Sequence, residues 1–112
     1  MALDTVAEYI SLARTLLMDE SDSPYRYSDA SLVLALNLAI METKKIRPDL
    51  LIGKTIPNFT AVNSDPVDMD VMYRIPLVYY IIGHAQMRDE EGNQDQRAAG
   101  FLGLFRSQMG GI

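Results

Sequence analysis

Three carboxylates, those of Asp65, Asp68 and Asp70, lie in the segment SDPVDMD, where they could bind a cation. A calcium loop needs oxygen ligands at alternating positions, a glycine at the sixth position and a bidentate glutamate at the twelfth. This segment has a different spacing, and Met69 stands between two of the aspartates. The chain also has no Glu-x-x-His pair of the kind found in di-iron bundles. We therefore interpret these aspartates as turn and cap residues and expect no metal site.

His84 is the only histidine of the chain. A histidine that acts as a general base needs a group to orient it or a nucleophile within reach. No serine neighbours His84 in the sequence, and the chain has no cysteine. We interpret His84 as a structural residue of an apolar helix, and we expect neither a catalytic residue, nor a cofactor, nor an enzyme.

The formal charge of the 112-residue chain is −5, with a pI near 4.6. A duplex-binding module normally has a basic face, because neutralisation of phosphates supplies most of its affinity. Only Lys44, Lys45 and Arg47 cluster here, at the end of a predicted helix, where cations stabilise the helix dipole. The length suits one domain.

The beginning of the chain has no basic segment ahead of a long apolar run, so we expect no signal peptide. No stretch approaches the roughly 18 apolar residues that a membrane-spanning helix requires. The longest candidate, IPLVYYIIGHA, is too short and is soon followed by charged residues. We expect a soluble protein without a membrane partner.

Capping signals and apolar periodicity predict four helices. Thr5 begins a capping box, Ser28 is suited to the N-cap of the second helix, and Pro76 to the first turn of the third. Gly92 is typical of the residue that follows a helix. The prediction is a mainly all-α, four-helix bundle-like domain over residues 1–112, with helices near 5–18, 29–46, 76–91 and 94–108. An extended loop or a short β-hairpin occupies residues 48–75, and a flexible tail spans 109–112.

The second predicted helix is apolar on two nearly opposite faces. Leu32 and Leu36 lie on one face, and Leu34, Leu38 and Met41 lie on the other. A helix of a small isolated domain should instead expose one polar face. We predict that Leu32 and Leu36 belong to the core, and that the other three residues lie partly at a contact with another subunit.

Two further patterns concern packing. Gly100 and Gly103 lie inside the last predicted helix, and close approach of a neighbouring helix is the usual reason for such glycines.

Tyrosine suits subunit contacts because it buries a large ring and keeps one polar group. Packing at the edge of the core explains tyrosines near helix ends equally well. Those at issue are Tyr25, Tyr27, Tyr73, Tyr79 and Tyr80.

The segment RYSDASLVLALNLAIMETKKIRPDL resembles the head-to-tail adaptor, or connector, proteins of tailed bacteriophages. The C-terminal segment IPLVYYIIGHAQMRDEEGNQDQRAAGFLGLF is similar to the family's third helix, acidic junction and last helix. Residues 50–66 match poorly. The positions that carry the first similarity are Tyr27, Ser28, Asp29, Leu32, Leu36, Asn37, Ala39, Arg47 and Pro48.

The resemblance implies a small helical virion protein, made in the host cytoplasm, at the head–tail junction. Copies would form a closed ring, typically a dodecamer, between the portal protein and a tail or nozzle protein. Genomic DNA would pass through the ring without sequence-specific binding. The subunit or portal interface would then include Tyr25, Tyr27, Leu34, Leu38, Met41 and Tyr79.

The sequence leaves two other functional classes open. A small helical DNA-binding regulator or antitoxin-type module would need a recognition helix that begins with exposed polar side chains. Only the segment GNQDQR comes near this pattern, and the acidic residues before it oppose DNA binding. An enzyme would need titratable groups that converge on one site, and no such group accompanies His84 in the sequence.

Overall fold

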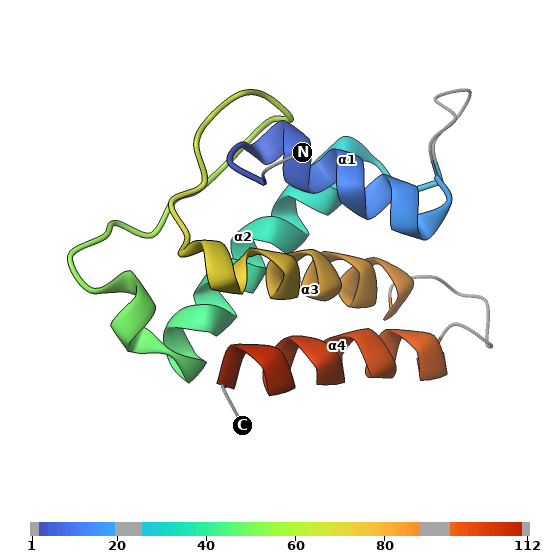
Figure 1. Ribbon diagram of the computed structural model, residues 1–112. Coiled ribbons are helices and arrows are strands. Elements are labelled where there is room, and N and C mark those ends of the chain that lie inside the picture. The colour runs from blue at the N-terminus through green and yellow to red at the C-terminus, as the bar shows by residue number, and fades with distance from the viewer. Residues whose placement is uncertain (1–2, 20–25, 88–94, 111–112) are drawn as a thin grey trace.

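The fold is a mainly α-helical domain in a computed structural model that describes residues 3–19, 26–87 and 95–110. Figure 1 shows α3 in the middle, with α1 on one side, α4 on the other and α2 crossing behind. The helices are α1 (Val6–Leu17), α2 (Asp29–Ile46), η1 (Pro48–Leu51), η2 (Val71–Tyr73), α3 (Arg74–Met87) and α4 (Asp95–Gly110). The mainly all-α prediction is confirmed.

The predicted capping residues begin the first two helices. The Thr5 hydroxyl accepts a hydrogen bond from the Glu8 amide, and the Glu8 carboxylate accepts one from the Thr5 amide. The Ser28 hydroxyl accepts a hydrogen bond from the Ser31 amide at the start of α2. These bonds satisfy backbone donors that have no partner within the helix.

The segment 48–75 has no β-hairpin, although the structure describes all of it. It consists of η1, an extended loop, η2 and the first two residues of α3. An isolated antiparallel bridge joins Pro66 to Thr5, and the carbonyl groups of Asn63 and Asp65 accept hydrogen bonds from the Ala7 and Val6 amides. The loop therefore caps the first turn of α1.

Asn37 attaches the same loop to α2. Its side-chain oxygen accepts a hydrogen bond from the Phe59 amide at 2.9 Å, and its nitrogen donates one to the Phe59 carbonyl at 2.8 Å. Asn37 thus satisfies both backbone groups of Phe59, as a neighbouring β-strand would do. The loop is held against this side of α2 by its backbone.

The core lies where α3 contacts the other three α-helices. Leu32 and Leu36 of α2 are fully buried, as predicted, and so is Tyr9 of α1. Burial raises the pKa of Tyr9 well above its usual value. The α3 and α4 side chains of the same core are Leu77, Val78, Ile81, Ile82, Ala85, Phe105 and Met109.

Two predicted boundaries need correction. Helix α3 begins at Arg74 rather than Pro76, because η2 continues directly into it. Helix α4 extends to Gly110, so the predicted tail at 109–112 does not begin at Met109, whose side chain is fully buried. The predicted ends at 88–91 and 94, and Gly92, lie outside the described residues.

The prediction of close helix approach at Gly100 and Gly103 is wrong. Both glycines are exposed, and a Cβ atom built on either would meet nothing within 4 Å. The close approach occurs instead at Gly83 of α3, where a Cβ atom would lie 2.8 Å from Leu102 Cγ and 3.1 Å from the Ala98 carbonyl oxygen. The α3–α4 contact therefore depends on a glycine in α3.

We expect Gly83→Val to destabilise the domain by about 1–3 kcal/mol, because the new side chain would push α4 away from α3. Gly103→Val is the matched control on α4 and should change the free energy of unfolding by less than about 0.5 kcal/mol. Urea denaturation of both variants measures the difference. Equal stability of the two variants would contradict this account of Gly83.

Candidate functional site

Asp68 and Asp70 of the segment SDPVDMD have different structural roles. Asp70 is the N-cap of η2 and accepts a hydrogen bond from the Met72 amide at 2.9 Å. Asp68 forms a surface ion pair with Lys54 at 3.2 Å. Within the described ranges, no group of three His, Cys, Asp or Glu side chains could hold a metal ion. The geometry supports the cap interpretation for Asp70.

His84 is half-buried on α3, with its ring stacked on that of Tyr80 at a centroid distance of 6.1 Å. Tyr80 in turn makes an edge contact with the Phe105 ring of α4 at 5.0 Å. Burial raises the pKa of the Tyr80 hydroxyl. These aromatic contacts position His84 as part of the α3–α4 packing.

Dialysis against a chelator should leave the melting temperature unchanged. The fold is held by helix packing, and the Asp65, Asp68 and Asp70 carboxylates do not converge on one point. A structural metal would instead stabilise the folded state by linkage, so its removal would lower the melting temperature. Thermal unfolding followed by circular dichroism, with and without chelator, decides between the two.

The strongest candidate for an interaction site is the outer face of α2. Leu34 is 46% exposed and Met41 is 48% exposed, with half-buried Leu38 between them. The spacing of these residues places them in one row, which we call the α2 stripe. Apolar side chains repeated along one helix face are typical of contacts with another protein.

The structure shows how the rest of α2 is covered. Leu32 and Leu36 pack in the core against the other helices, and the loop near Phe59 covers the side that carries Asn37. Among the large apolar side chains of α2, those of Leu34 and Met41 in the α2 stripe are exposed. The two-sided apolar pattern is thus explained in part by the loop and in part by a surface open to solvent.

The tyrosines predicted at the interface are packed within the chain. Tyr27 and Tyr79 are half-buried against the core, and the ring of Tyr79 lies 5.9 Å from that of Phe101 on α4. Tyr25 lies outside the described residues. Core-edge packing therefore accounts for both described rings, and Leu34 and Met41 of the α2 stripe are the exposed residues of the predicted set.

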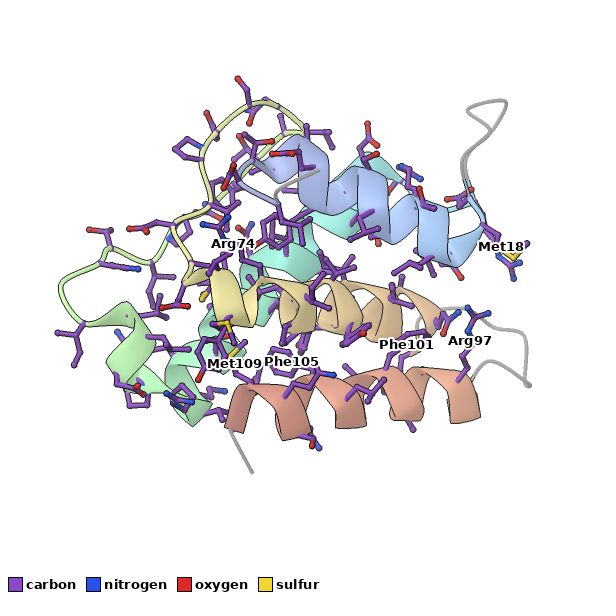
Figure 2. The ribbon with its side chains drawn as sticks, viewed as in Figure 1. Met18, Arg74, Arg97, Phe101, Phe105 and Met109 are labelled. Carbon is purple, nitrogen blue, oxygen red and sulfur yellow. The ribbon has the colours of Figure 1, made fainter. Side chains whose placement is uncertain are left out.

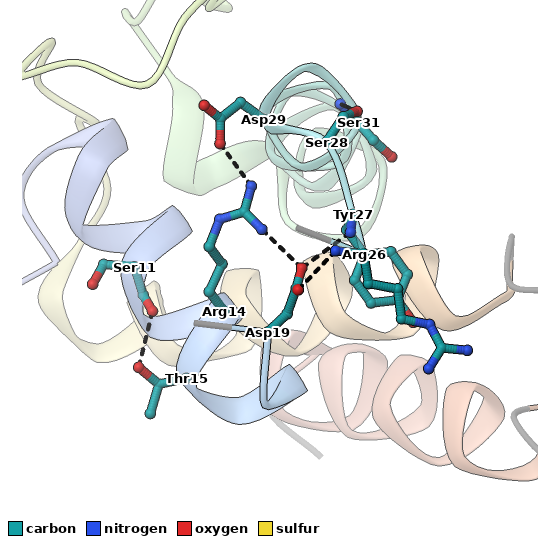
Figure 3. A network of polar contacts seen from close by, with 9 residues as sticks. All are labelled: Ser11, Arg14, Thr15, Asp19, Arg26, Tyr27, Ser28, Asp29 and Ser31. Carbon is teal, nitrogen blue, oxygen red and sulfur yellow. Dashed lines mark hydrogen bonds and ion pairs between the residues drawn. The ribbon is translucent and has the colours of Figure 1, made fainter. Parts of the chain in front are cut away.

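A buried polar network joins α1 to the start of α2 and was not predicted from the sequence (Figure 3). Arg14 contacts the Asp19 carboxylate at 2.8 Å and the Asp29 carboxylate at 2.6 Å. Asp19 also accepts hydrogen bonds from the backbone amides of Arg26 and Tyr27. The signal in the sequence is a basic residue, Arg14, directly after Ala13 and between the apolar residues Ile10 and Leu17. The network holds the end of α1 against residues 26–29 at the start of α2.

Arg47 forms a second junction, at the other end of α2. Its guanidinium group makes two contacts with the Asp49 carboxylate and donates hydrogen bonds to the Tyr73 hydroxyl and the Met109 carbonyl. The ion pair holds the pKa of the Asp49 carboxyl below its usual range. Arg47 thus connects α2, η1, η2 and α4, a role more specific than the predicted helix-end stabilisation.

Comparison with protein-family models, with curated proteins and with solved structures yields no match for this chain. In the part of the chain that the structure describes, no helix is both long enough and apolar enough to cross a membrane.

Proposed function

We propose that this protein is a structural subunit of a ring that joins the portal of a tailed bacteriophage head to the tail and continues the DNA channel. The observation that carries the proposal is the α2 stripe, Leu34, Leu38 and Met41, on a helix whose opposite face is fully buried. In a ring, each subunit needs surfaces for its neighbours and for the proteins above and below it. The stripe supplies one such surface, toward a neighbouring subunit or the portal.

The positions that resemble the adaptor family have structural roles in this chain, which supports the proposal. Ser28 caps α2, Leu32 and Leu36 form the core, Asn37 holds the loop, and Arg47 connects four helices. These residues would keep the domain rigid while α2 presents its stripe. An adaptor that works by assembly alone would need such residues and no catalytic group.

The charge of the chain suits a channel through which DNA passes. A net charge of −5 opposes non-specific adhesion to the phosphate backbone. The partners under this proposal are further copies of the chain in a ring, typically of twelve, together with the portal protein and a tail or nozzle protein. The ring would be located at the head–tail junction of the virion.

Light scattering together with negative-stain imaging in the presence of the phage's own portal protein tests the proposal. We expect rings seated on the portal and, without the portal, a monomer of 12.5 kDa. A protein that never assembles on the portal would overturn the proposal. A gel shift with duplex DNA that survives moderate salt would favour a DNA-binding regulator instead.

A further inference from the structure

Val71 and Met72 form an exposed apolar projection, which we call the knob. They lie in η2, immediately before α3, and are 69% and 78% exposed. Two exposed carboxylates precede them in the chain: Asp70, which caps η2, and Asp68, which pairs with Lys54 at 3.2 Å and is exposed enough to meet a second cation as well. The knob therefore combines a protruding apolar pair with an acidic border.

The outer flank of α4 is concave and carries a positive charge, in contrast to the protruding, acidic knob. Arg97, Gly100, Phe101 and Leu104 line a shallow hollow of about 460 Å³, which we call the hollow. The guanidinium group of Arg97 lies over the Phe101 ring, 5.5 Å from its centroid, and donates a hydrogen bond to the Leu16 carbonyl. The missing side chain at Gly100 leaves space on this flank. The hollow therefore combines an apolar floor with a basic border.

The knob and the hollow lie at opposite ends of the domain. Helices α3 and α4 are antiparallel, because Gly83, near the end of α3, lies against Ala98 and Leu102, near the start of α4. The hollow is thus beside the end of α3, whereas the knob precedes its beginning. A helix of 14 residues spans about 20 Å. Figure 2 shows Arg97 and Phe101 at one end, and Arg74, which follows η2, at the other.

We propose that the knob of one copy inserts into the hollow of the next copy, with Asp68 and Asp70 facing Arg97. This inference rests on the proposed ring and identifies two of the surfaces that build it. The knob of a chain cannot reach its own hollow, so the contact is head-to-tail and repeats from copy to copy. Opposite charges at the two borders favour this pairing over knob to knob or hollow to hollow. The contact is additional to that of the α2 stripe.

Cysteine crosslinking tests the contact directly, since the chain contains no cysteine of its own. The variant Met72→Cys, Leu104→Cys carries one thiol in the knob and one in the hollow. Assembled on the portal and treated with a short bis-maleimide, it should give a ladder of covalent oligomers. Docked thiols have an effective concentration in the millimolar range, so crosslinking should be roughly a hundredfold faster than between free copies at about 10 micromolar concentration.

The matched control is Met72→Cys, Met87→Cys, in which the second thiol replaces the exposed last residue of α3, which lies beside the other flank of α4, next to Ala99 and Gly103. It should crosslink no faster than free copies do. A mixture of the single variants Met72→Cys and Leu104→Cys should stop at dimers, because each copy then carries one reactive thiol.

The charges can be tested in the same assay. Arg97→Glu should weaken ring formation on the portal, and Asp68→Lys in the same chain should restore it, since the pair is then reversed. Restoration would not occur if Arg97 acted only within its own chain.

Three results would overturn the inference. Rings that form on the portal without a Met72–Leu104 crosslink above the control would refute the contact and leave the proposed ring intact. Crosslinks of Met72→Cys to itself, or of Leu104→Cys to the portal, would assign these surfaces to other partners. Absence of rings with the wild-type protein would refute the proposed function and the contact together.

Discussion

Leu36→Asp should leave no folded domain, whereas Leu34→Asp should fold almost as well as the wild type and fail to assemble. Leu36 is fully buried, and loss of such a leucine side chain alone costs about 2–5 kcal/mol. A buried carboxylate without a partner adds a further desolvation cost. Leu34 is 46% exposed, so its carboxylate stays in water and should change stability by about 0.5 kcal/mol or less.

The same charge in the α2 stripe should prevent assembly, because an interface core excludes unpaired carboxylates. Circular dichroism and urea denaturation measure folding, and imaging of rings on the portal measures assembly. Leu34→Ala and Leu36→Ala provide the conservative controls. Unfolding of both aspartate variants would refute the interface role of the stripe, and normal assembly of Leu34→Asp would do the same.

The helices of this fold follow from local signals in the sequence. The Thr5–Glu8 capping box and the Ser28 cap place the starts of α1 and α2 to the residue, because capping depends on groups a few positions apart. Periodicity also places Leu32 and Leu36 on one face of α2 and Leu34 and Leu38 on the other. Which of the two faces is buried depends on contacts that α2 makes with the rest of the domain, and no local signal carries this information.

The contacts that the sequence did not predict are between segments far apart in the chain. Asn37 binds Phe59, and Arg47 binds Met109, although nothing near either residue indicates its partner. The contacts of the glycines could not be predicted from the sequence either. Gly83 permits a close helix contact and Gly100 does not, because the outcome depends on which flank of each helix faces its neighbour. The hollow on α4 and the knob at η2 depend on the same tertiary arrangement.

The second large effect on stability is expected at the buried ion pair between Arg14 of α1 and Asp19, which follows α1. Arg14→Met should destabilise the domain by about 3–5 kcal/mol, because it leaves the Asp19 carboxylate buried without its cation. The side chains of Arg14 and Asp19 are only 7% and 8% exposed, so water cannot replace the lost contact. Such a loss is a large part of the roughly 5–15 kcal/mol that stabilises an ordinary domain. Urea denaturation measures it.

Asp29→Asn is the matched control, because Asp29 contacts the same guanidinium group with a side chain that is 61% exposed. A surface ion pair of this kind contributes about 0–1 kcal/mol, so the control should be close to wild type. The double variant Arg14→Met, Asp19→Asn should recover part of the loss, since it removes both buried charges together. The side-chain amide oxygen introduced by Asp19→Asn can still accept a hydrogen bond from the amides that Asp19 binds. If Arg14→Met were no less stable than Asp29→Asn, the network of Figure 3 would be a surface feature, and the entry of the chain into α2 would have to be fixed by apolar packing alone.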